Sequence, residues 1–200
     1  MRVLWLLFGI ALICAGQGCA NSQHEMSWIQ HQGGLVQGPC LAKAQRAEAR
    51  LGTDLTALNV LDDPAPGAYS WPDGNVFVTK GLVDLLTEQE LAAAIAHEMG
   101  HLLNDGHLQA PVSLQGCCTT PNIEERADAI GVRLLQQAGI SRDVMPQMLE
   151  KVERASSTSA GCRSNMQKRI DLLRSPSRSA DLKIALATPH PSADPMAAFR

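Results

Sequence analysis

The residues with the clearest capacity for chemistry are five in a row, His97-Glu98-Met99-Gly100-His101. On a helix, residues four apart lie on one face a turn apart, so both imidazoles can reach a single metal ion. Glu98 lies beside that face, where its carboxylate can take a proton from water on the metal. The pattern therefore predicts a metal centre that activates water. The competing interpretation is two unrelated histidines on an exposed helix.

A catalytic zinc ion needs a third protein ligand and an open position for water. Glu124 and Asp128 are also four residues apart and would share one face of a helix. We expect Glu124 to bind the metal and Asp128 to accept a hydrogen bond from the ring N–H of a ligand histidine. The alternative is that both are solvated acids at a helix start, stabilised by the helix dipole. If Glu124 is not a ligand, Glu125 is the next candidate.

Two predicted helices must position these groups. The spacing of Thr87 and Glu90 fits a capping box, which predicts a helix over residues 88–105. Pro121 is typical of a first helical turn, so the second helix should span residues 122–138, with a glycine just after its end. The histidines and the acids would then come from two different helices.

The rest of the chain is expected to form a small α+β scaffold around these helices. Further helices are expected over 39–51, 81–86, 141–154 and 166–173, and strands over 58–60 and 75–79. Residues 20–38 are rich in Gln, Ser and Gly and are expected to form a flexible tether. Residues 189–200 contain three prolines and are expected to be an irregular tail. We therefore expect one mostly helical α+β domain over residues 39–188.

Composition limits the class of partner. The chain has 17 basic and 20 acidic residues, a net charge of −3, and only 4% aromatic residues. Such a chain has neither the positive charge nor the stacking surfaces that bind DNA or RNA. Its hydrophobic fraction of 45% is enough for one core. Nucleic acid is therefore not an expected partner.

The N-terminal residues indicate export. Arg2 precedes an apolar run over residues 3–13, which is too short to span a bilayer and typical of a signal peptide. We expect residues 1–19 to be a lipoprotein-type signal, with Cys19 lipidated as the membrane anchor, and the protein on the outer membrane facing the periplasm. Cleavage after Ala20 would instead give a soluble periplasmic or secreted protein, and an uncleaved anchor is the remaining alternative.

Four further cysteines would meet an oxidising compartment after export. We expect Cys40, Cys117, Cys118 and Cys162 to form two disulfides, with the pairing left open. The adjacent pair Cys117 and Cys118 would form only a strained bridge, so each is expected to have a distant partner. A cysteine-rich zinc site is the weaker alternative, because the sequence has no C-x-x-C spacing.

The sequence Glu-x-x-Ala-Asp downstream of H-E-x-x-H, followed by Gly131 and Ala138-Gly139, resembles the HtpX-like zinc metalloendopeptidases. This family includes the CAAX prenyl proteases and small lipoprotein peptidases of bacterial envelopes. The segment from Ala68 to Leu82 is similar to the family's strand segment before the catalytic helices. The resemblance extends over about residues 40–174.

This resemblance implies a zincin-type metallopeptidase domain that binds one zinc ion. It implies His97, His101 and Glu124 as the zinc ligands and Glu98 as the general base. It also implies polypeptide substrates, held by strand addition to an edge strand near Ala68–Trp71.

Two departures from the family pattern bear on the site. Only 22 residues separate His101 from Glu124, which suggests a shorter lid and a more open cleft. The family also has a His-Pro pair before an Arg-Ile pair, and that histidine is thought to steady the transition state. Here Arg169-Ile170 is present, but Arg163-Ser164 occupies the His-Pro position. Either Arg163 supplies the positive charge, His190 reaches in, or the contribution is missing, at a cost of about a hundredfold in rate.

The sequence therefore predicts an exported zinc metalloendopeptidase that hydrolyses misfolded or misassembled envelope proteins. The alternative is a non-proteolytic chaperone or assembly lipoprotein that keeps zinc for structure. The Arg163-Ser164 departure is the feature that favours the alternative.

Overall fold

The computed structural model describes residues 15–52, 57–71, 73–104, 112–114, 121–157 and 159–175, with side chains from residue 23 onward. Most of the expected signal (residues 1–14) and the whole expected tail (residues 189–200) lie outside these ranges. Residues 105–111 and 115–120, which belong to the connection between His101 and Glu124, also lie outside these ranges.

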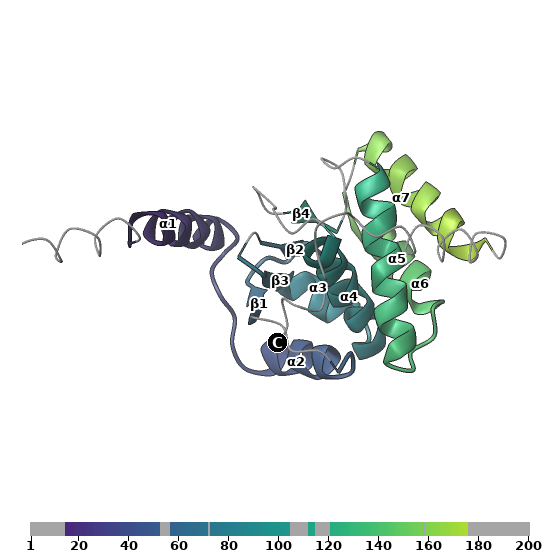
Figure 1. Cartoon of the computed structure of the whole chain (residues 1–200), viewed down its shortest axis with the longest axis horizontal. Helices are drawn as coiled ribbons and strands as arrows, with labels where there is room; N and C mark the ends of the chain where they lie inside the picture. Colours follow the sequence, from purple (N-terminus) through teal and green to yellow (C-terminus); the bar gives the residue numbers. More distant parts are fainter. Residues whose placement is uncertain are drawn as a thin grey trace, which may run out of the picture.

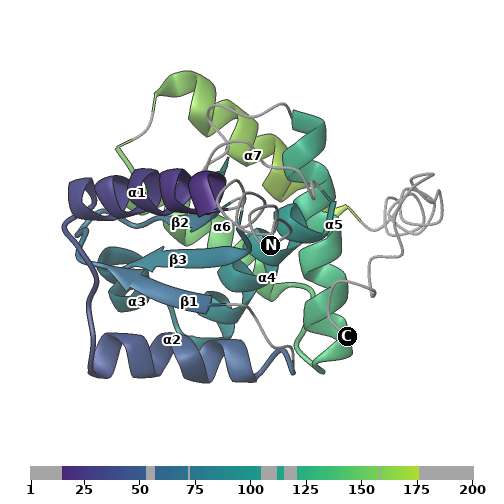
Figure 2. The ribbon, with the colours of Figure 1, turned by 60° about the vertical axis from the view of Figure 1, so that its left-hand side comes forward.

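The described chain is an α+β fold in which helices dominate, as the sequence predicts (Figure 1). In chain order its elements are α1 (Ala15–His31), α2 (Pro39–Ala49), β1 (Ala57–Leu61), β2 (Ala68–Ser70), β3 (Asn75–Thr79), α3 (Lys80–Leu85), α4 (Glu88–Asn104), β4 (Val112–Ser113), α5 (Pro121–Gln137), α6 (Val144–Ala155) and α7 (Ala160–Arg174). Helix α4 lies between the sheet and helices α5 and α6 (Figure 1, Figure 2).

The sheet has the strand order β1-β3-β2-β4. Strand β3 is parallel to β1 and antiparallel to β2, and β2 is antiparallel to β4. The prediction that Ala68–Trp71 forms an edge strand is therefore wrong, because β2 has a neighbour on each side. Strand β4 pairs Ser113 with Tyr69 and so occupies the outer position. A strand of two residues gives no alternation from which the sequence could predict it.

The two faces of the sheet are covered differently. Ala68 and Ser70 of β2, like Val78 of β3, are fully buried, and Ala68 and Val78 belong to the main core with α4. Tyr69 and Phe77 are paired across the two strands and point to the other face, since neighbouring residues of a strand alternate. The face toward α4 is thus the one that can contribute side chains to the predicted site.

Helix α1 covers the other face, which corrects the expectation of a flexible tether over residues 20–38. Trp28 of α1 stacks edge-on against Tyr69 and Phe77, with ring centroids 5.3 and 5.2 Å apart. Ile29 is also buried there, only 6% exposed. The segment is polar on average, but Trp28 and Ile29 bury apolar surface against the sheet, and this burial stabilises the helix. Past His31 the chain has no regular element until α2.

The other elements lie close to their predicted positions, with one exception. Helix α7 begins at Ala160, six residues before the predicted start at Met166. Ser159 caps it by accepting a hydrogen bond from the backbone N–H of Cys162 at 3.3 Å. The first turns of this helix are exposed, so they carry none of the apolar spacing on which the prediction relied.

No helix in the described part of the chain is both long enough and apolar enough to cross a membrane.

Candidate metal centre

Helix α4 is fixed at its start by the predicted capping box. The Thr87 hydroxyl accepts a hydrogen bond from the Glu90 backbone N–H at 3.3 Å, and the Glu90 carboxylate accepts one from the Thr87 N–H at 2.9 Å. Lys151 of α6 donates to the same carboxylate at 2.7 Å. Every residue of α4 from Glu90 to His101 is buried. The two histidines are therefore presented from a rigid, central helix rather than from an exposed one.

Helix α5 crosses α4 at very short range because two contact residues have no side chain. A Cβ atom on Gly100 would lie 2.5 Å from the backbone oxygen of Ala127, and one on Gly131 would lie 3.1 Å from that of Ala96. The first distance excludes any side chain without a backbone shift, and the second is tighter than nearly all Cβ contacts in proteins. The close crossing is what brings Glu124 and Asp128 of α5 within reach of the α4 histidines.

The three predicted ligands meet at one point. The Nε2 atoms of His97 and His101 are 3.1 Å apart, and they lie 3.3 and 3.6 Å from the carboxylate oxygens of Glu124. All three side chains are buried, at 0%, 0% and 2% exposure. The structure thus gathers one ligand atom from each residue within 4.8 Å of the others.

These distances fit a zinc ion. Zinc–nitrogen and zinc–oxygen bonds of about 2.0–2.2 Å at tetrahedral angles place neighbouring ligand atoms about 3.4 Å apart. The two imidazole nitrogens are 3.1 Å apart, a distance that suits a hydrogen bond when one of them carries a proton and suits two ligands of one cation when neither does. Two histidines and one carboxylate are a common ligand set of catalytic zinc.

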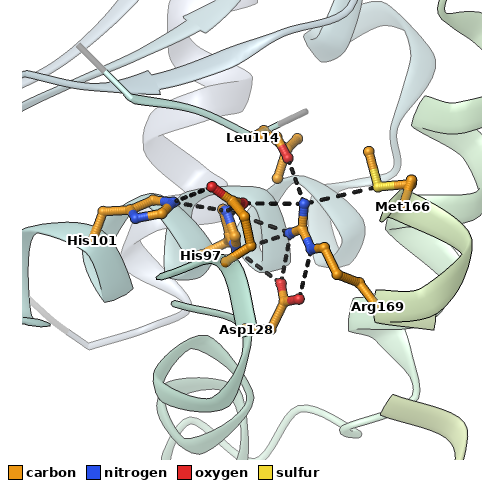
Figure 3. Close-up of polar contacts among 7 residues, drawn as sticks. His97, His101, Leu114, Asp128, Met166 and Arg169 are labelled. Carbon is orange, nitrogen blue, oxygen red and sulfur yellow. Dashed lines mark hydrogen bonds and ion pairs between the residues drawn. The ribbon is translucent and has the colours of Figure 1, made fainter. Parts of the chain in front are cut away.

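Asp128 and Arg169 fix the positions of the predicted ligands His97 and Glu124 through hydrogen bonds and ion pairs (Figure 3). Asp128 accepts a hydrogen bond from Nδ1 of His97 at 2.8 Å, which leaves the Nε2 lone pair pointing to the other ligands. Arg169 of α7 binds Asp128 through two parallel contacts, each of 2.8 Å. Its third nitrogen donates to the backbone oxygen of Leu114 at 2.8 Å and lies 3.1 Å from Glu124. One guanidinium therefore links α5, α7 and the residue after β4.

The charges of the buried cluster also favour a divalent cation. In the state that would bind a metal, with both histidines neutral and Glu98, Glu124 and Asp128 ionised, three carboxylates face the single guanidinium of Arg169, an excess of two negative charges. Buried charge without compensation is costly, and a divalent cation offsets this excess.

The pKa shifts of the histidines point the same way. Burial by itself would lower the pKa of His97, but hydrogen bonds to Asp128 and Glu124 outweigh it and raise the pKa to about 9. Surroundings that favour a proton on His97 also favour a cation beside it. Burial lowers the pKa of His101 to about 3, helped by the charge of His97, so His101 is neutral and its lone pair is available.

Glu98 is positioned differently from Glu124. Its side chain is fully buried, yet neither carboxylate oxygen has a hydrogen-bond partner among the described residues. Burial raises its pKa to about 8, and the charge of Glu124 adds to this while that of His97 opposes it. A nearby cation would lower this pKa again and make the carboxylate a base at neutral pH.

The structure brings together all five predicted site residues of the two helices: His97, Glu98, His101, Glu124 and Asp128. Glu125, the alternative ligand, is exposed and is not in the group of converging ligand atoms. Cys19 lies in α1, and its side chain is outside the described residues.

Arg163 does not enter the site. It is exposed in the first turns of α7, six residues before Arg169 and hence on another face of the helix. His190 lies outside the described residues. The charged residue of α7 that does enter the site is Arg169, for which the sequence alone predicts no role beyond its place in the Arg-Ile pair. A signal existed, because Arg169 falls on the apolar face that carries Met166 and Leu173.

The cysteines correct one further expectation. Cys162 is disulfide-bonded. Cys117 and Cys118 lie outside the described residues. Cys40 is a free thiol, half-buried at the start of α2. It packs against the main core, where burial as a small apolar group accounts for it without a disulfide.

Comparison with known proteins supports the metal centre. Residues 37–122 match the model of peptidase family M48, a span that contains His97, Glu98 and His101. The chain is 44% identical over 57 residues to a protease HtpX homolog of Dictyoglomus thermophilum, a match that covers 26% of this chain and 19% of the relative. It is 33% identical over 76 residues to one from Sulfurovum sp., covering 36% and 26%. One from Tropheryma whipplei is 37% identical over 57 residues, covering 26% and 20%.

The matched segments thus span only about a fifth to a quarter of the length of these curated relatives. The α4 motif and strands β1 to β4 lie within residues 37–122, which match the family model, and Glu124 of α5 follows two residues later. These matches, together with the buried group of His97, His101 and Glu124, show that the chain is similar to peptidase family M48 and to proteins named as protease HtpX homologs.

Proposed function

We propose that this protein is a zinc-dependent endopeptidase in which His97, His101 and Glu124 hold the metal and Glu98 is the general base. The observation that carries the proposal is the buried convergence of two helices on one point, with ligand atoms 3.1–3.6 Å apart. The similarity to relatives named as proteases supports the same chemistry.

Each side chain then has a distinct task. Zinc, when bound, supplies the Lewis acidity that polarises a peptide carbonyl and acidifies water. Glu98 takes the proton from the attacking water and passes it to the leaving amine. Asp128 keeps the His97 ring in the orientation and tautomer that present Nε2 to the metal, and Arg169 keeps Asp128 ionised and in place.

The alternative function, a zinc-containing chaperone without hydrolysis, accounts less well for this arrangement. A structural zinc site is normally closed by four protein ligands. The described residues supply three, and next to them is a carboxylate with no hydrogen-bond partner in the described part of the chain. A buried acid placed in this way has a use in hydrolysis and none in holding a structural ion.

The direct test of the function is hydrolysis of an unfolded protein such as casein, with and without metal. The zinc-loaded protein should cleave casein within the chain. Removing zinc with a chelator should abolish cleavage, and adding zinc back in stoichiometric amount should restore it. Cleavage that persists in the metal-free protein would contradict the proposal, as would a zinc-loaded protein that never cleaves.

We further propose that the protein is exported to the bacterial envelope, is anchored there through a lipidated Cys19, and hydrolyses misfolded or misassembled envelope proteins. The apolar run over residues 3–13 followed by Gly18-Cys19 supports export and lipidation. Polypeptide substrates follow from the peptidase family itself.

Replacing Cys19 tests the anchor. Cys19→Ser should move the protein from the membrane fraction to the soluble envelope fraction, because lipid chains provide the membrane affinity. Fractionation followed by immunoblotting measures this, with Cys40→Ser as the matched control that leaves the distribution unchanged. If Cys19→Ser stays on the membrane, an uncleaved anchor is the better explanation. A mature protein that begins at Asn21 would show soluble export instead.

A further inference from the structure

Ser70 is a buried hydroxyl that the proposed mechanism does not use. It lies at the end of β2, between β3 and β4, and its side chain is 0% exposed. Its oxygen has no hydrogen-bond partner among the described residues. A buried hydroxyl in that condition costs free energy, so its presence in a tightly packed sheet calls for an explanation.

The position of Ser70 in the sheet supplies one. Ser70 and Ala68 point to the face of β2 that packs on α4, and Ala68 belongs to the core shared with that helix. Glu98 of α4 is likewise fully buried and likewise without a hydrogen-bond partner in the described chain. Strand β2 borders the metal centre, because the Ala68 carbonyl accepts a hydrogen bond from the Leu114 N–H at 3.0 Å and the Leu114 carbonyl accepts one from Arg169 at 2.8 Å. In keeping with this position, the Ser70 hydroxyl is the one hydrogen-bond donor among the influences that lower the pKa of Glu98.

The two needs are complementary. A carboxylate that accepts a proton from water with one oxygen must have its other oxygen held, or the base rotates away from the reacting water. Ser70 has a donor to give, and the strands on both sides fix its backbone. No formed hydrogen bond joins them in this structure, so a small rotation of either side chain is needed to make one.

We propose that Ser70 is a positioning residue that donates a hydrogen bond to the Glu98 carboxylate and holds it in the orientation that receives the proton from water. The inference rests on the proposed hydrolytic role of Glu98. It makes the sheet a part of the catalytic apparatus, not only a support for α4.

The test compares Ser70→Ala with a second buried hydroxyl. Thr79, at the end of β3, is also 0% exposed, but its hydroxyl is fully used: it donates to the Ala65 oxygen at 2.7 Å and accepts from the N–H groups of Gly67 and Leu82 at 2.9 and 3.1 Å. Thr79→Val therefore removes a hydroxyl that serves structure, whereas Ser70→Ala removes one that serves Glu98.

Ser70→Ala should bind zinc normally, melt at or slightly above the wild-type temperature, and lose about tenfold in kcat on casein peptides with KM within about twofold. Thr79→Val should show the reverse, a lower melting temperature with kcat unchanged below the transition. In a Glu98→Gln background, Ser70→Ala should lower the residual kcat by less than about twofold, because the group it positions is already gone. Unchanged kcat in Ser70→Ala, or a full tenfold loss in the Glu98→Gln background, would overturn the proposal.

An infrared measurement separates this inference from the proposed function. The carboxylate band of Glu98 is isolated as the difference between wild type and Glu98→Gln, both zinc-loaded. Ser70→Ala should shift that band and Thr79→Val should leave it in place, whether or not the protein cleaves casein. A band that does not move overturns the role of Ser70, while a zinc-loaded wild type that fails to cleave casein overturns the function.

Discussion

Glu98→Gln should keep its zinc and lose at least a hundredfold of its rate of casein hydrolysis. The amide has the size and shape of the carboxylate but cannot accept a proton, so the general base is removed while the ligands remain. Zinc content should stay at one per chain, because Glu98 is not among the three residues whose ligand atoms converge. Rate and metal content are measured on the same preparation.

The matched control is another glutamate of the same helix. Glu88 lies in the first turn of α4, where it pairs with Arg46 at 2.8 Å and its side chain is 30% exposed. Glu88→Gln should change neither zinc content nor rate. A Glu98→Gln protein that hydrolyses casein at the wild-type rate would exclude Glu98 as the base, and one that loses its zinc would make Glu98 a ligand.

Replacement of a metal ligand should lower the zinc content as well as the rate of hydrolysis. His101→Ala and Glu124→Gln each remove one of three metal bonds, so zinc should be lost on dialysis and hydrolysis with it. Asp128→Asn should be intermediate, with zinc affinity reduced about ten- to a hundredfold, because the imidazole of His97 is less well oriented. Elemental analysis gives the zinc content, and competition with a chelator of known affinity gives the dissociation constants.

Glu125 provides the control for this series. It is adjacent to Glu124 on α5 but exposed, so Glu125→Gln should retain full zinc and full activity. If Glu124 were only a solvated acid at a helix start, Glu124→Gln would behave in the same way as Glu125→Gln. Equal zinc content in the two variants would therefore exclude Glu124 as the third ligand.

Much of this site could be predicted because its information is local. The capping box at Thr87 and Glu90 fixes the start of α4, and the four-residue spacing of His97 and His101 then fixes their common face. The same argument applies to α5. Both helices appear within one or two residues of their predicted limits.

The contacts that complete the site are not local. Arg169 lies 41 residues from Asp128 and 55 from Leu114 along the chain, so no spacing rule connects them. The position of Ser70 depends on how strand β2 packs on helix α4, and no sequence motif predicts that packing. Gly100 illustrates the same limit: within H-E-x-x-H its type is unconstrained, yet the approach of Ala127 leaves no room for a side chain.

The most direct test of the metal centre is a crystal structure of the zinc-loaded protein with diffraction data collected on both sides of the zinc absorption edge. The anomalous signal should show a single zinc ion per chain, bonded at about 2.0–2.2 Å to Nε2 of His97, Nε2 of His101 and a carboxylate oxygen of Glu124. Glu98 should be near the ion but not bonded to it. A zinc peak bound by cysteines, or no peak between these three side chains, would contradict the assignment.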